Sequence, residues 1–253
     1  MSSSFADFAR SLVFNALFYL NMIVRMVVAL PTIMLPRVFM LRVLRAYARS
    51  SLSLLRVVCG VNVDWRGRVK LPQGAYIVAC KHQSAWETFA LFMLLPDPTF
   101  VLKRELMWIP LFGWLAAKSG MIPIDRGARA TALARMTARA REEIADGRQI
   151  VIFPEGTRRP PGAEPRYLPG VAHLYAEMGV PCVPIALNSG LFWPRRTLRR
   201  YAGTVLVEVL DPIAPGLDRR AFQRELQNVL EAATARLVSE SENKGEGSEI
   251  GHA

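Results

Sequence analysis

Cysteine and histidine are both scarce in this chain of 253 residues. Its cysteines, Cys59, Cys80 and Cys182, are odd in number and widely spaced, and they form no CxxC pair. This pattern argues against a disulfide framework and a zinc site, and it suits a reducing compartment. The sequence also lacks a GxSxG turn, and no serine or cysteine nucleophile with its own base is evident. We therefore expect neither a metal ion nor a covalent intermediate on such a nucleophile.

Acidic residues are outnumbered, with 21 against 32 basic residues and a formal net charge of +11. A surface of this sign favours an anionic partner, such as nucleic acid, anionic lipid headgroups, or an acidic substrate or carrier. The basic residues are rich in arginine beside aliphatic runs, and no nucleic-acid-binding module is recognisable. We therefore expect no nucleic-acid partner.

Charge is almost missing from residues 11–36, where Arg25 is the one charged side chain. A bilayer span needs about 20 apolar residues, and residues 11–30 meet that length. Two asparagines make the span a mediocre one, and Arg25 would have to snorkel or find a partner. Pro31 and Pro36 prevent a single helix from continuing through this region.

Arginines are interleaved with apolar residues immediately after this segment. If the region is helical, its leucines offer apolar contacts while the basic side chains reach lipid headgroups: Arg37, Arg42, Arg45, Arg49 and Arg56. We expect residues 1–60 to form a helical membrane-anchoring segment whose arginine-rich side faces the cytoplasm. The alternative is a buried helical hairpin of a soluble protein with a solvated arginine face.

Beyond residue 60, short apolar runs alternate with longer amphipathic stretches, which predicts an α/β fold with a mixed, largely parallel sheet flanked by helices. The predicted strands are residues 75–80, 99–102, 121–124, 149–153, 181–187 and 204–210. The predicted helices are residues 89–95, 105–118, 128–145, 170–178 and 218–238. This domain is expected to span residues 61–238, and the acidic residues 239–253 are expected to form a disordered tail.

His82 is the histidine best placed for chemistry, because it follows the apolar run at residues 75–80 and precedes Glu87 by five positions. On one helix that separation turns two side chains about 140° apart. The pair can therefore meet only if His82 lies in the loop before a helix and Glu87 lies in its first turn. The carboxylate could then hold one imidazole nitrogen and leave the other free to take a proton. A structural role is expected for His173, and His252 lies in the tail.

A second polar stretch, with a turn at residues 155–158, follows the apolar strand at residues 149–153. Gly156 permits a tight turn and the close approach of a ligand. Thr157 can cap or donate a hydrogen bond, and Arg158 can bind a phosphate with two hydrogen bonds. The alternative is an ordinary polar turn with a solvated arginine.

A third stretch, residues 120–126, presents Asp125 and Arg126 at a strand end, and Lys103 and Arg104 add positive charge at the previous strand end. The large apolar residues before it could wall a channel for an apolar chain, although ordinary core is the stronger expectation: Trp108, Phe112 and Trp114. A fourth stretch, residues 180–187, reads as an apolar strand broken by Pro184, which could equally be a core or edge strand.

Together these stretches resemble the four ordered sequence blocks of the glycerolipid acyltransferase family, specifically the bacterial 1-acyl-sn-glycerol-3-phosphate acyltransferases. The first block is a His and an acid with four residues between them, here His82 and Glu87. The second is matched by residues 120–126. The third, Phe-Pro-Glu-Gly-Thr-Arg, is matched completely by residues 153–158, and the fourth by residues 180–184.

The resemblance covers residues 61–210 and departs from the family at two positions. Glu87 stands where the family usually has Asp, which is one methylene shorter, and Pro123 replaces the usual aromatic residue of the second block. Neither change removes a required functional group, but the longer acid alters the geometry expected between His82 and Glu87.

The resemblance implies transfer of a fatty acyl group from an acyl thioester, on coenzyme A or acyl carrier protein, to the free hydroxyl of 1-acyl-sn-glycerol 3-phosphate. The product would be phosphatidic acid, with no cofactor beyond the thioester co-substrate. His82, oriented by Glu87, would act as general base. The residues expected to bind the acceptor are Lys103, Arg126 and Arg158 at its phosphate, and Glu155, Gly156 and Thr157 near its glycerol.

The implied partners are a lysophospholipid, a thioester donor and membrane lipids, at the cytoplasmic face of a bacterial inner membrane. Three alternatives stay open at this point. The acceptor could be another lysolipid, such as a lyso-ornithine lipid or a different lysophospholipid, or it could be glycerol 3-phosphate. The chain could also be a basic membrane-binding protein without catalysis.

Overall fold

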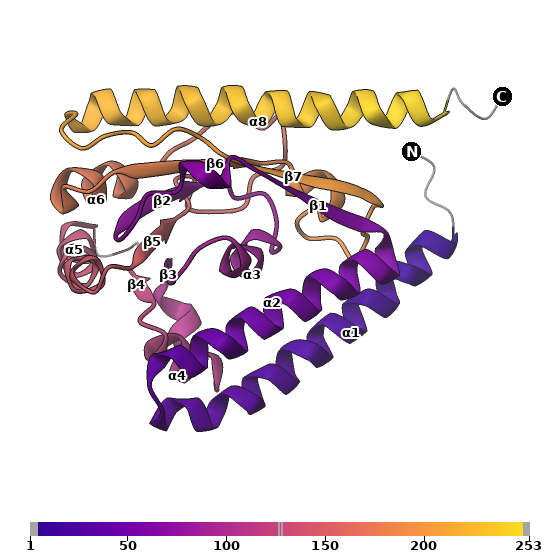
Figure 1. Cartoon of the computed structure of the whole chain (residues 1–253), viewed down its shortest axis with the longest axis horizontal. Coiled ribbons are helices and arrows are strands. Elements are labelled where there is room, and N and C mark those ends of the chain that lie inside the picture. Colours follow the sequence, from indigo (N-terminus) through magenta and orange to yellow (C-terminus); the bar gives the residue numbers. More distant parts are fainter. Residues whose placement is uncertain (1–4, 126, 128, 250–253) are drawn as a thin grey trace.

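A seven-stranded sheet forms the centre of the molecule (Figure 1). The computed structural model describes residues 5–125, 127 and 129–249. The strand order is β1-β7-β6-β2-β5-β3-β4, and every neighbouring pair is parallel except β6 with β7. The strands are β1 Val61–Arg66, β2 Tyr76–Cys80, β3 Pro98–Lys103, β4 Ile122–Ile124, β5 Gln149–Ile152, β6 Cys182–Leu187 and β7 Gly203–Val209. The predicted mixed, largely parallel sheet is confirmed.

Helices cover both faces of this sheet. On one face lie α5 (Arg129–Ala145), α6 (Gly170–Met178) and α8 (Arg219–Glu249), whose apolar residues pack with Ile77, Ile150 and Leu206 of the strands. On the other face lie α1 (Phe5–Ala29), α2 (Arg37–Cys59) and α3 (Glu87–Ala90). The remaining helical segments are α4 Phe112–Lys118, α7 Ser189–Phe192, and the 3-10 turns η1 Leu30–Met34, η2 Arg68–Lys70, η3 Leu91–Met93 and η4 Arg104–Trp108.

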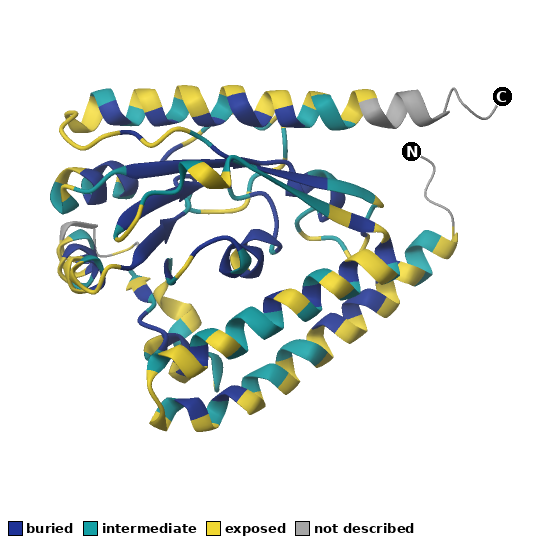
Figure 2. Ribbon diagram, in the orientation of Figure 1, coloured by how far each residue is buried: buried dark blue, intermediate teal, exposed yellow. Residues whose placement is uncertain are grey.

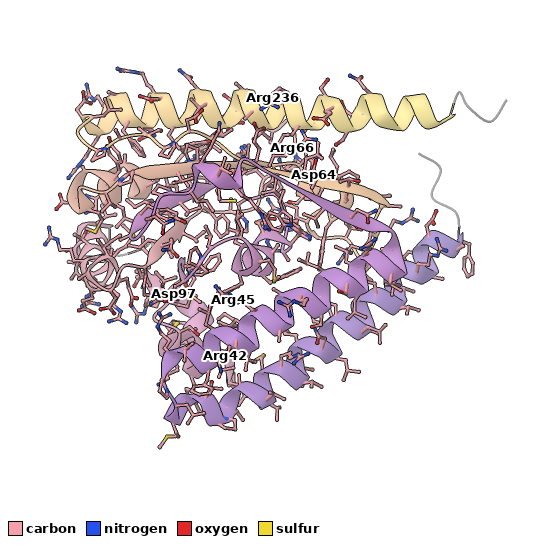
Figure 3. The ribbon with its side chains drawn as sticks, in the orientation of Figure 1. Arg42, Arg45, Asp64, Arg66, Asp97 and Arg236 are labelled. Carbon is pink, nitrogen blue, oxygen red and sulfur yellow. The ribbon has the colours of Figure 1, made fainter. Side chains whose placement is uncertain are left out.

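The helices α1 and α2 form an antiparallel hairpin that lies along the α/β domain (Figure 1). Pro31 and Pro36 flank the turn between them, as expected from the sequence. At the turn end, the guanidinium of Arg37 pairs with the carboxylate of Asp97. Arg45 donates to the backbone carbonyls just before Asp97, and Figure 3 shows Arg45 and Asp97 beside each other where α2 passes the sheet. These polar contacts fix the hairpin to the domain.

The polar residues that made α1 a mediocre membrane span face the protein. Asn15 donates to the carbonyl of Leu198 at 2.7 Å and accepts from the buried guanidinium of Arg200 at 2.7 Å. Asn21 donates to the hydroxyl of Ser51 in α2 at 3.0 Å. By length and composition Phe5–Met34 could cross a bilayer, and it is the one such helix in the described part of the chain, with 22% of its most apolar window buried.

Three features differ from the sequence-based expectation. β1 was not predicted as a strand. The predicted helix at residues 105–118 is interrupted at Pro110, because proline cannot donate to a helical hydrogen bond. The helix α8 runs to Glu249 rather than ending at residue 238, so much of the expected disordered tail is helical. Glu240 pairs with both terminal nitrogens of Arg66, and Ser241 accepts from Asn188 at 2.6 Å, which ties this extension to the domain.

The buried residues concentrate in the sheet and on the inner sides of the helices (Figure 2). All five residues of β2 and all six of β6 are buried. Pro184 lies inside β6, which has neighbours on both sides, so this strand belongs to the core and not to an edge. On the far edge, Figure 3 shows Arg66 and Asp64 of β1 close together below α8. The sheet is therefore a rigid frame for the loops at its strand ends.

Candidate active site

The carboxyl ends of four parallel strands meet at one edge of the sheet. The register pairs Ala79 of β2 with Ile152 of β5, and Lys103 of β3 with Ile124 of β4. The loops after β2, β5, β3 and β4 therefore begin at the same edge, and they carry His82, residues 153–158, Lys103 and Asp125. Strands in a sheet lie about 4.8 Å apart, so all four strand ends fall within roughly 15 Å of one another. In open α/β sheets this is the edge where ligands bind.

The imidazole of His82 and the carboxylate of Glu87 meet, as the sequence predicted they could. His82 lies in the loop after β2, and Glu87 is the first residue of α3. The distance between His82 Nδ1 and Glu87 Oε1 is 2.8 Å. Because an ionised carboxylate only accepts hydrogen bonds, Nδ1 carries the proton and the lone pair of Nε2 is left free. The geometry gives a base with one nitrogen held and the other available.

Glu87 is itself held by a set of donors in a fully buried position. Its Oε1 also accepts from the backbone N–H groups of Gln83 at 2.7 Å and Ser84 at 2.8 Å. Its Oε2 accepts from the hydroxyls of Ser84 at 3.2 Å and Ser189 at 2.9 Å. The longer side chain of Glu, compared with the Asp usual in the family, is therefore accommodated without losing the contact to His82.

Phe153 fixes the plane of the His82 imidazole. The rings of His82 and Phe153 are stacked, with centroids 4.0 Å apart and an interplanar angle of 17°. The His82 side chain is 13% exposed, so one edge of the ring reaches solvent. With one face covered by Phe153 and Nδ1 held by Glu87, the ring has little freedom to rotate.

Lys81, next to His82, lies at the centre of a buried charge network. Its ammonium contacts Glu155 Oε1 at 2.7 Å and Glu231 Oε1 of α8 at 2.8 Å. The hydroxyl of Tyr167 donates to Glu231 at 2.8 Å, and burial together with that carboxylate raises the pKa of Tyr167, which keeps its proton in place. The second oxygen of Glu155 accepts from the backbone N–H of His82 at 3.0 Å. The network therefore links α8 to the backbone of His82.

The turn at residues 153–158 is closed by its own backbone and tied to His82. Gly156 has φ 65°, a left-handed conformation that glycine adopts without strain, and its N–H donates to the carbonyl of Phe153 at 2.9 Å. The N–H of Arg159 donates to the carbonyl of His82 at 2.8 Å. Thr157 and Arg158 are exposed on this turn. The guanidinium of Arg158 is therefore exposed to solvent beside a backbone hydrogen bond that ties this segment to His82.

The other cations predicted for the site lie further along the same edge. Lys103 is half exposed at the end of β3 and pairs with Glu105 at 3.2 Å. Arg104 pairs with Asp125 after β4 at 2.7 Å, so the conspicuous acid of the second block is engaged in an ion pair. Arg126 lies outside the described residues.

A cysteine two positions before His82 is not a competing nucleophile. Cys80 is fully buried, and its thiol lies 3.3 Å from the carbonyl of Lys81. Burial raises the pKa of the Cys80 thiol well above its usual value, and the carboxylates of Glu87 and Glu155 raise it further. A thiol in this environment stays protonated and unreactive. In the described residues, no group of three or more His, Cys, Asp or Glu side chains is placed to hold a metal ion.

Sequence analysis missed four residues that complete the site: Lys81, Ser189, Tyr167 and Glu231. Lys81 carried a signal, because a charged residue directly after an apolar strand and next to His82 has to find a partner if it is buried. Glu231 lies 150 positions from Lys81 along the chain and Ser189 lies 102 positions from Glu87. Nothing in their local sequence could have placed them here. His173 hydrogen-bonds Thr137 at 2.8 Å, in keeping with a structural role.

The chain is similar to known acyltransferases in sequence. The acyltransferase family model matches residues 62–188. The 1-acyl-sn-glycerol-3-phosphate acyltransferase of Pseudomonas aeruginosa is 36% identical over 200 residues, covering 78% of this chain and 77% of that protein. The human 1-acyl-sn-glycerol-3-phosphate acyltransferase alpha is 30% identical over 168 residues, covering 65% of this chain and 59% of the human protein.

The fold is also similar to a solved structure. The crystal structure of the 1-acyl-sn-glycerophosphate acyltransferase from Thermotoga maritima aligns with a TM-score of 0.74 at 20% identity, covering 90% of this chain and 97% of the other. The family model spans half of the chain, and the bacterial relative matches more than three quarters of it. This chain belongs to the acyltransferase family.

Proposed function

We propose that this acyltransferase moves a fatty acyl group from an acyl thioester to the free hydroxyl of 1-acyl-sn-glycerol 3-phosphate, forming phosphatidic acid. The observation that carries the proposal is the 2.8 Å contact between His82 Nδ1 and Glu87, which leaves the second ring nitrogen free on the edge shared with the exposed Arg158. The bacterial and human relatives are named 1-acyl-sn-glycerol-3-phosphate acyltransferases, which supports the same acceptor.

His82 acts as the general base in this proposal. Its free Nε2 takes the proton of the acceptor hydroxyl while that oxygen attacks the thioester carbonyl carbon. The tetrahedral intermediate then collapses, the carbon–sulfur bond breaks, and the proton on His82 passes to the leaving thiolate. Glu87 stabilises the imidazolium that forms in between. General-base catalysis of this kind is worth on the order of 10²–10⁴ in rate.

The turn at residues 156–158 recognises the acceptor. Arg158 is exposed and has a planar guanidinium suited to two parallel hydrogen bonds with a phosphate. Gly156 lets the acceptor approach the backbone, and Thr157 offers a hydroxyl. Lys103 adds positive charge two strands away from β2, at roughly 10 Å by strand spacing, and the family resemblance adds Arg126 to the phosphate-binding cations. Cations in this arc hold the phosphate while the hydroxyl reaches His82.

Glu155 acts by positioning His82 rather than through the direct glycerol contact that the family resemblance implied. Its side chain is 2% exposed, and its two oxygens are occupied by Lys81 and by the backbone N–H of His82. A carboxylate this deeply buried is out of reach of a substrate hydroxyl. Its place in the reaction is to hold the loop that carries the base.

Lipid substrates reach the site from the membrane, against which the α1–α2 hairpin lies. The outer side of α1 exposes a continuous apolar stripe that includes Leu20, Ile23, Val24, Val27 and Val28. Because the hairpin is antiparallel, with Asn15 of α1 bonded to the domain and Asn21 of α1 bonded to α2, we propose that α1 lies in one leaflet rather than crossing the bilayer.

The face of the membrane follows from the second helix of the hairpin. Three arginines of α2 are exposed at seven-residue spacing, which puts them on one side of the helix: Arg42, Arg49 and Arg56. Arginines beside an apolar segment bind anionic headgroups and mark the cytoplasmic side. We place the enzyme at the cytoplasmic face of a bacterial inner membrane.

The experiment that tests the function is an acceptor panel on the purified full chain. Lysophosphatidic acid, a lyso-ornithine lipid, other lysophospholipids and glycerol 3-phosphate are each incubated with acyl-CoA and, separately, with acylated acyl carrier protein. Products are identified by lipid mass spectrometry. We expect phosphatidic acid as the main product with wild type, and its formation to be slower by a factor on the order of 10²–10⁴ with His82→Ala. Preferred acylation of another lysolipid would overturn the acceptor assignment. Vesicle binding without acylation of any acceptor would overturn the enzymatic function.

A further inference from the structure

The connection between β3 and β4 exposes an unusual group of large apolar side chains. Trp108 is 67% exposed and Trp114 is 64% exposed, although sequence analysis expected them in the core or around a channel. Ile109 and Leu106 are exposed beside them, at 48% and 37%. We call these four residues the aromatic tip. Scattered exposed apolar residues are ordinary, but two tryptophans and two aliphatic residues within nine positions form a patch that needs a partner.

The exposure is built into a tightly packed segment. Gly113, the second residue of α4, lies directly against η4: a Cβ atom on this residue would lie 2.0 Å from the carbonyl oxygen of Met107. The residue two positions earlier, Leu111, adopts φ 63°, which is rare for a residue with a side chain. Leu115 on the inner side of α4 is buried. The segment therefore turns small and aliphatic residues inward and holds both tryptophans outward.

The aromatic tip adjoins the turn of the α1–α2 hairpin. Leu115 of α4 packs with Ala29 of α1 and Met40 of α2 in one apolar cluster, and Figure 1 shows α4 beside the hairpin turn. The hairpin turn itself exposes Met34 at 89% and Leu35 at 41%. The apolar surface of the hairpin thus continues onto the aromatic tip through the packed α4.

Two basic side chains beside the aromatic tip suit a lipid surface, and each also pairs with an acid: Lys103 with Glu105 and Arg104 with Asp125. Lys103 and Arg104 are exposed at the start of the segment, and the Arg104 guanidinium lies 5.7 Å from the ring centre of Trp108. Tryptophan prefers the boundary between headgroups and acyl chains, and neighbouring basic side chains bind anionic headgroups. The continuity with the hairpin and this pairing of indole with cation favour a bilayer over a protein partner.

We propose that the aromatic tip inserts into the bilayer interface as a second membrane contact beside the α1–α2 hairpin. This inference rests on the proposed function, since an enzyme that acylates a membrane lysolipid works at the bilayer. The tip connects β3 and β4, whose ends carry Lys103 and Asp125. Insertion of the tip therefore holds the phosphate-binding edge of the sheet at the level of the headgroups, where the acceptor phosphate lies.

The test uses the intrinsic fluorescence of the full chain on vesicles of phosphatidylglycerol and phosphatidylcholine with brominated acyl chains. Trp86 and Trp193 are buried, and Trp65 is half-buried on β1 at the opposite edge of the sheet. Quenching by bromine therefore reports the tip. We expect strong quenching in wild type and its loss in W108F/W114F, which removes both indoles but keeps aromatic rings.

A second variant measures the contribution of the tip to binding. W108A/W114A is expected to lower vesicle affinity about tenfold or more, because two large aromatic side chains no longer leave water. V69A is the matched control: Val69 is 96% exposed in η2, after β1 at the opposite edge of the sheet, and its loss should leave affinity unchanged. Unquenched wild type, or equal affinity of W108A/W114A and wild type, would overturn the proposal. So would a change in oligomeric state of W108A/W114A in light scattering, with vesicle affinity unchanged, which would mark a self-association surface.

A water-soluble acceptor separates this proposal from the proposed function. With a short-chain lysophosphatidic acid below its micelle concentration and no vesicles, W108A/W114A should turn over like wild type. With long-chain acceptor in vesicles its rate should fall together with its vesicle affinity. Acylation of neither acceptor by wild type would refute the proposed function, whereas equal rates of both proteins on vesicles would refute the role of the tip alone.

Discussion

Replacing Glu87 by Gln tests how the acid beside His82 contributes to catalysis. The substitution keeps the size of the side chain, and the carbonyl oxygen of the amide can still accept from the backbone N–H groups of Gln83 and Ser84. The amide nitrogen would then face the hydroxyls of Ser84 and Ser189, which can rotate to accept a hydrogen bond. We therefore expect E87Q to fold, and its effect to report the lost charge.

The magnitude follows from the separation of the two charges. With Nδ1 and Oε1 2.8 Å apart, the charge centres of an imidazolium and the carboxylate lie about 4 Å apart. At an effective dielectric constant of about 20 their attraction is about 4 kcal/mol. The imidazolium forms only as the reaction proceeds, so losing this attraction raises the activation free energy. An increase of about 4 kcal/mol corresponds to about a thousandfold decrease in kcat.

The assay is steady-state acyl transfer to lysophosphatidic acid, followed by release of the free thiol, with circular dichroism as the check on folding. We expect kcat of E87Q to fall about a thousandfold, with KM for the acceptor little changed. E87D is the matched control, because it restores the charge on a side chain one methylene shorter, and its loss should be smaller than that of E87Q. A kcat of E87Q within threefold of wild type, in a folded protein, would refute the role assigned to Glu87.

Three further substitutions test other parts of the site. Lys81→Met leaves the buried carboxylate of Glu155 without its cation, so the free energy of unfolding in urea should fall by about 3–5 kcal/mol. The double variant K81M/E155Q should recover most of this stability. If K81M loses less than about 1 kcal/mol, the charge network does not stabilise the fold as argued. Cys80→Ala should keep kcat within a few-fold of wild type, because the thiol is buried and protonated; a hundredfold loss would point to a covalent intermediate. Arg158→Ala should raise KM for the acceptor about ten- to hundredfold, because a charge-assisted hydrogen bond is worth about 1.5–3 kcal/mol. Since the side chain is exposed, kcat and the melting temperature should change little. An unchanged KM would show that Arg158 does not bind the phosphate.

Most of the sheet could be predicted because its central strands are short apolar runs that are buried on both faces, as β2 and β6 are. β1 was missed although Val61, Val63 and Trp65 alternate with polar residues, the pattern of a half-buried edge strand. Only the pairing with β7, contributed from the other end of the domain, distinguishes it from a loop.

The site was predictable to the extent that it is local. His82 and Glu87 lie in one loop-to-helix segment, so spacing alone limited how they could meet. The partners that hold them come from distant parts of the chain, and Glu231 on α8 is joined to Lys81 only by the fold. Trp108 and Trp114 show the opposite failure, because their apolar character predicted burial. A packed turn at Gly113 instead directs them to the surface, which side-chain composition does not reveal.

The most direct test of the account is the rate at which His82→Ala, shown to be folded by circular dichroism, forms phosphatidic acid from lysophosphatidic acid and an acyl thioester under single-turnover conditions. The account predicts a loss on the order of 10²–10⁴ relative to wild type, with acceptor binding retained. A rate within a few-fold of wild type would contradict it.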